Sequence, residues 1–286
     1  MKTYLDCIPC FIRQALDAVR LATSDKITHE RVLRGVMDAA GRMDFNQSPP
    51  VMGQQIHRIV RKLSRNEDPY KHVKDRFNRN ALDLYPQYKK MIEQSTMPLE
   101  AAVRLAIAGN IIDLGPSSEI DQSGIDEAIG YAWSGRLQGN MGLLEEAARS
   151  AENILYLGDN SGEIVFDRLL IEHLPVDKVT FAVRGSPVIN DATMADAEKT
   201  GMTGLVKVID NGSDAPGTII EECSEVFRRQ FNKADLVISK GQGNYETLSD
   251  VAKDIFFILK AKCPVIAQHI GCNLGSLVIL SRLKEA

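Results

Sequence analysis

The chain lacks the long apolar run of a membrane-spanning protein, and it carries no excess of positive charge. None of its apolar runs approaches the roughly 20 residues that a helix needs to cross a bilayer. Residues 1–6 contain an early acid and no long apolar core, so we do not expect a signal peptide. Because 34 lysines and arginines face 38 aspartates and glutamates, the net charge of −4 gives no general attraction to nucleic acid or to an anionic membrane. The 5 cysteines fit a reducing setting better than a disulfide scaffold, so we expect a cytoplasmic protein.

Familiar nucleophile and nucleotide motifs are also missing. The sequence contains no Gly-x-Ser-x-Gly, and its 5 histidines are scattered. The glycines that follow Lys240 match neither the phosphate loop of nucleotide hydrolases nor the dinucleotide fingerprint. The apolar share of 44% and the charged share of 25% are ordinary for a globular protein of this length, which has ample residues for a core.

The hydrophobic pattern changes near residue 150. Before it, apolar residues recur at helical spacing, and no clear strand is indicated. After it, apolar segments alternate with polar loops and helical stretches, which predicts a mainly parallel sheet covered by helices, an α/β fold. We expect a helical N-terminal domain over 1–149 and an α/β domain over 150–286. The expected strands are 153–157, 179–183, 205–209, 234–239, 255–259 and 276–280, with 264–267 extending or following the fifth.

Polar clusters follow four of the expected strands, and the carboxyl ends of parallel strands share the edge of the sheet that binds ligands. Asp159 and Asn160 follow the first strand, and Asn190 and Asp191 follow the second. Oxygen ligands of this kind suit Mg²⁺ or Mn²⁺. Taken alone, Asp159-Asn160 more readily indicates a turn or a helix cap, and Asp191 could equally cap the following helix. The shared edge favours a metal site.

The cluster after the fourth strand combines Lys240 with Gly241 and Gly243. Such a loop can cradle an anion through its backbone N–H groups while the lysine neutralises charge. The alternative is a turn whose glycines need positive φ angles. Ser213 lies in an Asn-Gly turn after the third strand and would touch a substrate only if that turn reached the site.

Two further features lie in the helical half. Asn110 and Asp113 could face the sheet edge across a cleft, although the residues alone predict only a loop. Cys7 and Cys10 form half of a thiolate metal site or a redox pair. Cys263, Cys272 and His269 could complete a metal site only if the two ends of the chain meet. Two thiols packed at a helix start are the alternative.

Three motifs, at 158–163, 184–193 and 240–246, resemble those of the metal-dependent damage-control phosphatases, a family long catalogued as a domain of unknown function. Residues 109–113 match as well, and Cys7-x-x-Cys10 is similar to the pair of the archaeal-type subgroup. The resemblance implies a helical N-terminal region packed on a three-layer α/β domain. It also implies hydrolysis of small phosphate esters, including sugar phosphates and damaged metabolites.

The resemblance further implies roles for individual residues. A divalent cation (Mn²⁺, Mg²⁺, Co²⁺ or Ni²⁺) would be held by Asp159, Asn160 and Asp191. Lys240 would contact the substrate phosphate and complete the catalytic set with the two aspartates. The candidate substrate-binding residues are Asn110, Asp113, Glu163, Arg184, Ser213, Gly241, Asn244 and Glu246.

We therefore expect a metal-dependent phosphomonoester hydrolase with a small phosphorylated metabolite as its substrate. Either an aspartate or a water molecule could attack phosphorus. One rival hypothesis is an S-adenosylmethionine-dependent carboxyl methyltransferase, although Arg184 stands where such a site needs an acid at the end of the second strand. The other is a non-enzymatic metabolite or metal sensor that uses Cys7 and Cys10 as a zinc or redox element.

Overall fold

A mostly parallel sheet forms the centre of the structure, a computed structural model that describes residues 1–111 and 122–282. Within those ranges seven strands pair in the order β1-β7-β6-β5-β2-β3-β4. Neighbouring strands are parallel except for β6 and β7, which are antiparallel. The strands are β1 (Leu137–Gln138), β2 (Ile154–Leu157), β3 (Val179–Val183), β4 (Lys207–Asp210), β5 (Leu236–Lys240), β6 (Ile255–Lys260) and β7 (Leu277–Arg282).

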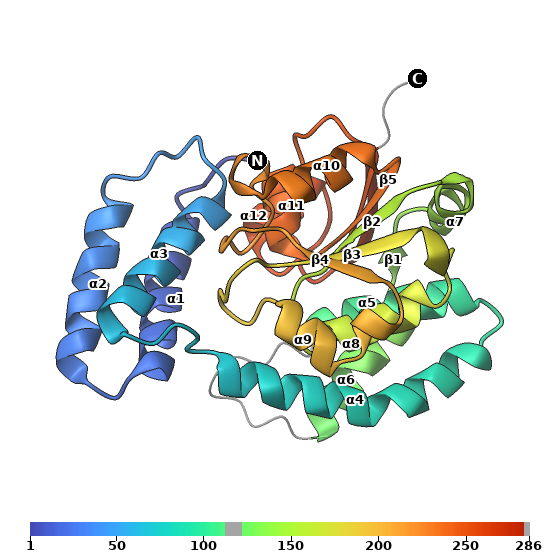
Figure 1. Cartoon of the computed structure of the whole chain (residues 1–286), viewed down its shortest axis with the longest axis horizontal. Helices are drawn as coiled ribbons and strands as arrows, with labels where there is room; N and C mark the ends of the chain where they lie inside the picture. The colour runs from blue at the N-terminus through green and yellow to red at the C-terminus, as the bar shows by residue number, and fades with distance from the viewer. Residues whose placement is uncertain (112–121, 283–286) are drawn as a thin grey trace.

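Helices cover both faces of the sheet, because side chains alternate between the faces along each strand. On β2, Tyr156 joins one hydrophobic cluster, whereas Leu155 and Leu157 join the cluster on the opposite face. Below the sheet in Figure 1 lie α4 (Lys71–Glu93), α5 (Pro98–Ile111), α6 (Gln122–Ser134), α8 (Glu163–Ile171) and α9 (Met194–Lys199), and α7 (Met141–Ser150) packs into the same cluster. Above it lie α10 (Glu225–Lys233), α11 (Gln242–Leu248) and α12 (Pro264–Ile270). The three-layer α/β fold expected from the sequence is confirmed.

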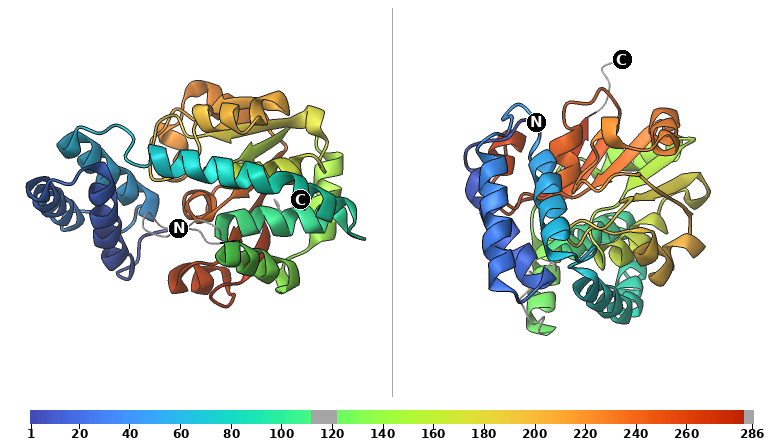
Figure 2. Two further views of the ribbon diagram at one scale, coloured as in Figure 1. Left: turned by 90° about the horizontal axis from the view of Figure 1, so that it is seen from below. Right: turned by 60° about the vertical axis from the view of Figure 1, so that its left-hand side comes forward.

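The first three helices form a bundle beside the sheet, at the left in Figure 1 and in the left view of Figure 2. They are α1 (Cys7–Ala22), α2 (Lys26–Ala40) and α3 (Pro49–Ser64), and they share a hydrophobic core of their own. Helix α3 contacts α11. Arg58 and Arg61 of α3 both form ion pairs with Asp214, in the loop after β4. The bundle is thereby fastened to the loops at the carboxyl edge of the sheet.

Most expected elements are present, with two local differences. Residues 264–267 neither extend nor follow the fifth strand as a strand, because Pro264 begins α12, where a missing N–H costs nothing. Strand β1 lies before residue 150, where no strand is expected, and with two residues it is too short to show alternation. The expected boundary at 149/150 falls in the last turn of α7, shortly before β2. Helix α5, from before that boundary, packs against α8 and β6.

The structure does not describe two of the side chains that were expected to bind substrate. Asp113 lies outside the described residues, and so does the side chain of Asn110. Within residues 1–111 and 122–282, none of the helices combines the length and the apolar character that crossing a membrane requires.

The order of the strands reverses between β2 and β5. After β2 the chain adds β3 and β4 on one side, and it then returns to place β5 and β6 on the other. Open α/β sheets bind ligands at such a switch point, outside the carboxyl ends of the strands. Asp159 follows β2, and Lys240 ends β5. The topology therefore brings two of the polar clusters together.

Candidate active site

The turns that follow β2 and β5 meet at the switch point. Gly241 follows β5 with a φ of 79°, and a Cβ atom on it would lie 1.9 Å from Asp159 Oδ2. Only glycine permits this approach of the backbone to the carboxylate. The Asn244 amide joins the two turns, because it donates to the carbonyl oxygens of Gly158 at 3.2 Å and Lys240 at 2.8 Å.

The second acidic pair reaches the same place through a short backbone bridge. Asn160 and Asp191 form an isolated antiparallel bridge, so the loops after β2 and β3 run side by side. Asn160 Nδ2 donates to Asp159 Oδ2 at 2.9 Å and to Glu163 Oε2 at 3.0 Å. Because these bonds orient the amide nitrogen, the amide oxygen is the atom of Asn160 that can serve as a cation ligand.

The loop that presents Asp191 contains a strained residue. Ile189 has a φ of 44°, which is unfavourable for a β-branched side chain. Its side chain packs against the core of the α1–α3 bundle. Strain of this kind persists where surrounding contacts fix the backbone, often at functional sites. The bundle therefore helps to hold the loop that carries Asp191.

The guanidinium group of Arg184, the residue directly after β3, lies beside the carboxylates of Asp159 and Asp191. Its side chain is 3% exposed, and its Nε lies 2.6 Å from Asp191 Oδ2. Its Nη2 lies 3.7 Å from Asp159 Oδ1, and its Nη1 donates to Asn244 Oδ1 at 3.1 Å. Arg184 thus positions both acidic side chains from inside the protein.

Lys240 lies behind the site, away from the pocket. Its side chain is fully buried, and its Nζ donates to Ala106 O at 3.0 Å, to Glu163 Oε1 at 2.7 Å and to Asp167 Oδ1 at 2.6 Å. Burial alone would lower the pKa of Lys240, but the Asp167 and Glu163 carboxylates raise it above its ordinary value. The expected contact with a substrate phosphate does not fit this geometry, because three acceptors already use the three ammonium protons.

The remaining expected residues divide into two groups. Glu246 lines a pocket together with Asp159, Asn160 and Asp191. Ser213 does not reach that pocket in the structure, because it is buried and its Oγ accepts a hydrogen bond from the N–H of Ala215 at 3.1 Å. The side chains that lie directly behind the pocket are Glu163, Arg184 and Asn244, with Gly241 at the turn.

The pocket lies between the acidic edge of the sheet and the α1–α3 bundle and has a volume of about 490 Å³. Its walls come from α1, the start of α3, α11 and the segment between β6 and α12. Burial raises the pKa of Glu246 to about 7, against the lowering effect of the hydrogen bond from Gln242. Sequence reasoning missed Lys262 and Gln242, which also line it. The signal for Lys262 was its place just after the fifth expected strand, at the same edge as Lys240.

The N-terminal cysteines lie on the wall of this pocket. Cys7 and Cys10 line it together with Cys263, so the two ends of the chain do meet. Among the described residues, however, no three histidine, cysteine, aspartate or glutamate side chains form a group that could hold a metal. Burial raises the pKa of the Cys7 thiol. A zinc or redox role for Cys7 and Cys10 stays a prediction.

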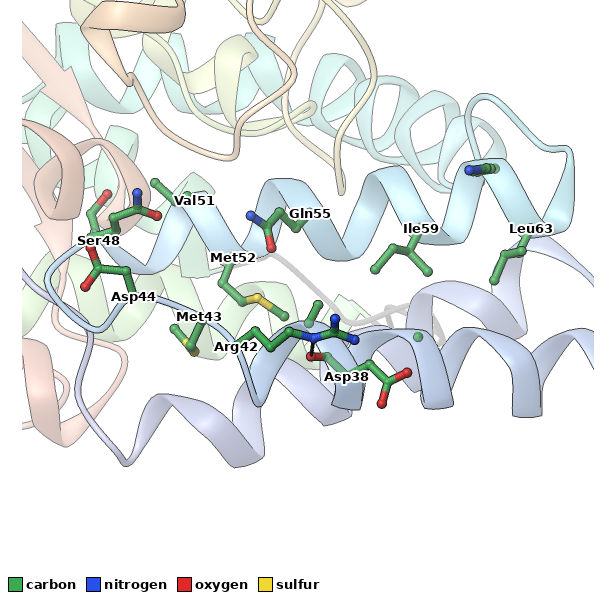
Figure 3. A pocket seen from close by; sticks show the side chains of 14 residues that line it. Asp38, Arg42, Met43, Asp44, Ser48, Val51, Met52, Gln55, Ile59 and Leu63 are labelled. Atoms are coloured by element: carbon green, nitrogen blue, oxygen red, sulfur yellow. Dashed lines mark hydrogen bonds between the residues drawn. The ribbon is translucent and has the colours of Figure 1, made fainter.

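A larger cavity of about 720 Å³ lies elsewhere, between α2 and α3. Figure 3 shows its lining, in which Arg42 lies next to Asp38, and apolar side chains such as Ile59 and Leu63 line much of the remainder. It contains none of the strand-end residues. The smaller pocket at the sheet edge is therefore the candidate active site.

The donor set of that pocket fits a hard divalent cation. Asp159 and Asp191 supply carboxylates, and Asn160 supplies an amide oxygen, the ligand types that Mg²⁺ and Mn²⁺ prefer. Burial, and then the charges of Glu163 and Asp191, raise the pKa of Asp159 well above its ordinary value, although Arg184 opposes the shift. A cation between the carboxylates would relieve this crowding of negative charge.

Comparison with known proteins identifies the family to which the chain is similar. The model of the damage-control phosphatase ARMT1-like domain matches residues 3–278. An uncharacterized protein of Methanocaldococcus jannaschii is 38% identical over 99% of this chain and 96% of its own length. A damage-control phosphatase of Pyrococcus horikoshii is 35% identical, with 98% of each chain covered. One of Archaeoglobus fulgidus is 32% identical over 97% of this chain and 98% of its own length.

A solved structure from the same family has the same fold. The crystal structure of a DUF89 family protein from Pyrococcus horikoshii superposes with a TM-score of 0.87 at 32% identity, covering 99% of this chain and 100% of the other. The family model spans the helical bundle, the sheet and every strand-end residue that lines the pocket. The chain therefore belongs to the damage-control phosphatase ARMT1-like family.

Proposed function

We propose that this protein is a divalent-metal-dependent phosphatase that hydrolyses small phosphate monoesters, such as sugar phosphates or damaged phosphometabolites. The observation that carries the proposal is the convergence of Asp159, Asn160 and Asp191 at the switch point, on the floor of a pocket. Two relatives that align over nearly the whole chain are named damage-control phosphatases, which supports the same reading.

Asp159, Asn160 and Asp191 would hold the cation, which could be Mn²⁺, Mg²⁺, Co²⁺ or Ni²⁺. When bound, such a cation supplies positive charge that polarises a phosphoryl oxygen and orients the reacting groups. The buried side chains around it keep the ligands in place. Arg184 holds Asp191, and Glu163 holds the Asn160 amide.

Lys240 would act through Glu163 and not through the substrate. Its ammonium pairs with both Glu163 and Asp167 in a fully buried cluster and offsets part of their negative charge. Without it, two carboxylates would be left close together in a medium of low dielectric constant. We propose that Lys240 is a positioning residue for the Asn160–Glu163 contact.

Glu246 would act as a general acid or general base at the pocket wall. Because burial raises its pKa to about 7, its carboxyl group is close to half protonated near neutral pH. That property suits a group that donates a proton to a leaving oxygen or accepts one from an attacking water. Asp159 and Asp191 stay available as ligands in this scheme.

The methyltransferase hypothesis has less support. Arg184 directly follows β3, where an adenosyl site needs an acid, and it is ion-paired with Asp191. The cysteines bear on the cellular compartment in which the protein acts. All five are free thiols. Because free thiols are typical of a reducing compartment, we propose that the protein acts in the cytoplasm.

The test is phosphate release from p-nitrophenyl phosphate and a panel of sugar phosphates after chelation and re-addition of each metal. We expect activity only with a metal present, and its loss in Asp159→Ala. Metal-independent release, or equal release by Asp159→Ala, would contradict the proposal. Methyl transfer from S-adenosylmethionine without phosphate release would favour the rival.

A further inference from the structure

Arg61 of α3 contacts two of the loops that build the candidate active site. Its Nη1 donates to the carbonyl oxygen of Pro187 at 2.8 Å, in the loop between β3 and α9 that carries Asp191. Its Nη2 forms an ion pair with Asp214, in the loop after β4. The Arg61 side chain is 14% exposed and is not part of the pocket lining. It therefore joins two loops at the edge of the sheet from outside the pocket.

The backbone of the loop between β3 and α9 is strained close to the metal-ligand candidate. Ile189 lies midway between Pro187 and Asp191, and its φ of 44° is unfavourable for a β-branched residue. Such a conformation persists only where surrounding contacts fix the backbone. The Ile189 side chain packs against the core of the α1–α3 bundle, and the contact with Arg61 lies two residues before it. Both contacts come from the bundle, so the bundle fixes the strained part of this loop.

The other end of this loop is fixed by the sheet. The N–H of Ala192 donates to Asp159 O at 2.8 Å, and the N–H of Arg184 donates to Ala192 O at 2.9 Å. Asp191 Oδ2 accepts from Arg184 Nε at 2.6 Å. Asp191 therefore lies between contacts to the sheet and contacts to the bundle. If the contacts to the bundle were lost, Ile189 could return to a favourable φ, and the backbone of Asp191 would move with it.

The ion pair with Asp214 fixes the Arg61 guanidinium in position. Burial would raise the pKa of Asp214, but hydrogen bonds from Arg58 and Arg61 lower it below its ordinary value. Arg58 donates to the same carboxylate through two N–H groups, at 3.0 and 2.6 Å. Pro216, two residues further on, lines the pocket and packs on α3 at Gly53, where an added Cβ would lie 2.9 Å from Pro216 Cγ. The guanidinium thus reaches the neighbouring loop from a fixed point on α3.

We propose that Arg61 is a positioning residue for the metal site, because it keeps the loop that carries Asp191 in the arrangement that binds a divalent cation. The inference rests on the proposed function for the nature of the bound group. Arg61 acts on Asp191 through the Pro187 carbonyl, from outside the pocket lining. Its planar guanidinium suits this role, since it presents N–H groups in fixed directions, one toward each loop. A ligand that is in place before the cation arrives need not be ordered on binding.

The experiment compares the full-length protein with Arg61→Met, Arg61→Lys and the matched control Arg58→Met. Arg58 shares the Asp214 carboxylate with Arg61, but its ion pairs are with Asp214 and Glu222, outside the loop that carries Asp191. In either Met variant Asp214 keeps the other arginine and the Gln54 amide as partners, so the fold should survive.

Two measurements need no turnover. Mn²⁺ affinity is measured by electron paramagnetic resonance, and amide hydrogen exchange of residues 188–192 is measured by mass spectrometry in the metal-free protein. Melting temperature is recorded for every variant, because a merely structural role would lower it without a local change in exchange. Phosphate release from p-nitrophenyl phosphate is then measured as a function of Mn²⁺ concentration.

We expect Arg61→Met to weaken Mn²⁺ binding by about tenfold to a hundredfold, the range for a lost supporting contact of a metal ligand. Exchange at residues 188–192 should become faster, and saturating Mn²⁺ should restore most of the phosphate release, because the ligands themselves remain. Arg58→Met should match the unaltered protein in both respects. Arg61→Lys keeps a positive charge beside Asp214 without the fork of the guanidinium and should fall between the two. It carries the comparison if Arg61→Met does not fold.

Unchanged Mn²⁺ affinity in Arg61→Met, or equal losses in Arg61→Met and Arg58→Met, would overturn the inference. A protein whose Mn²⁺ affinity depends on Arg61 but which releases no phosphate from any ester would end the proposed function alone. Absence of Mn²⁺ binding by the unaltered protein would overturn both.

Discussion

Lys240 Nζ lies 2.6 Å from Asp167 Oδ1, and both side chains are completely buried. Asp167 also accepts a hydrogen bond from the Tyr156 hydroxyl at 2.7 Å. Burial raises the pKa of Asp167 to about 6, although the Lys240 charge opposes the shift. The pair, together with Glu163, forms a buried cluster, and Glu163 in turn accepts a hydrogen bond from the Asn160 amide at the acidic edge of the sheet.

Replacement of this lysine distinguishes a supporting role from a role in substrate binding. Lys240→Met leaves Glu163 and Asp167 buried without their ammonium partner, so the free energy of unfolding should fall by about 3–5 kcal/mol. Urea denaturation measures the change. Adding Glu163→Gln and Asp167→Asn should recover part of the loss. A Lys240→Met protein of unaltered stability that has lost only phosphate affinity would show instead that the lysine binds substrate.

The turn after β5 offers a test of the metal ligands that leaves every ligand in the sequence. Gly241→Ala places a methyl group where Asp159 Oδ2 now lies and forces alanine to a φ of 79°. We expect Asp159 to be displaced and metal affinity to fall by at least tenfold, measured by Mn²⁺ binding. Gly204→Ala is the matched control, since no atom lies within 4 Å of its added Cβ. Equal metal affinities in the two variants would contradict the placement of Asp159.

Glu246 predicts a loss of stability as the pH rises. Its pKa is raised from 4.5 to about 7 in the folded protein, so the folded state binds more protons than the unfolded state between these values. The free energy of unfolding should therefore decrease by about 3 kcal/mol from pH 4.5 to above pH 7 through this group. Glu246→Gln should remove that decrease and be the more stable protein at pH 8. Glu221→Gln, on the surface, is the control, and an identical pH profile in all three proteins would refute the prediction.

His57 predicts the opposite dependence. Its ring is buried on α3, 5.9 Å from the Tyr70 ring centroid, and burial, with the Arg61 charge, lowers its pKa from 6.5 to about 3. The unfolded state binds more protons between these values, so stability should be complete above pH 6.5 and decline as the pH falls toward 3. His57→Phe should reduce the loss between pH 6.5 and 4.5, measured by urea denaturation. The exposed His72→Phe should keep it; the same acid sensitivity in both variants would show that His57 is not the cause.

The sequence predicted the sheet and its acidic edge well because both follow from local signals. Apolar, β-branched segments mark β2 and β5, and polar residues directly after a parallel strand must lie at its carboxyl edge. Asp159 and Asp191 could be placed on one edge for that reason alone. Their common pocket also needed the packing of the α1–α3 bundle, which supplies much of its wall.

The role of Lys240 could not be predicted from its position in the sequence. A residue at the end of a strand can point into the ligand crevice or into the helix layer beneath it, and only packing decides. In the structure, Ala106 of α5 and Asp167 of α8 supply the acceptors that hold the lysine inward. Those residues lie 134 and 73 positions away, so no local pattern links them to Lys240.

Mn²⁺ titration of the chelated protein, with free Mn²⁺ followed by electron paramagnetic resonance and phosphate release followed in the same samples, tests the central claim most directly. Asp159→Asn and Asp191→Asn, which remove a charge with little change of shape, are titrated beside the unaltered protein. We expect p-nitrophenyl phosphate hydrolysis to rise in step with Mn²⁺ binding, and both to be lost or strongly weakened in the two variants. Hydrolysis without bound Mn²⁺, or tight Mn²⁺ binding retained in both variants, would contradict the claim that these carboxylates hold the metal of a phosphatase.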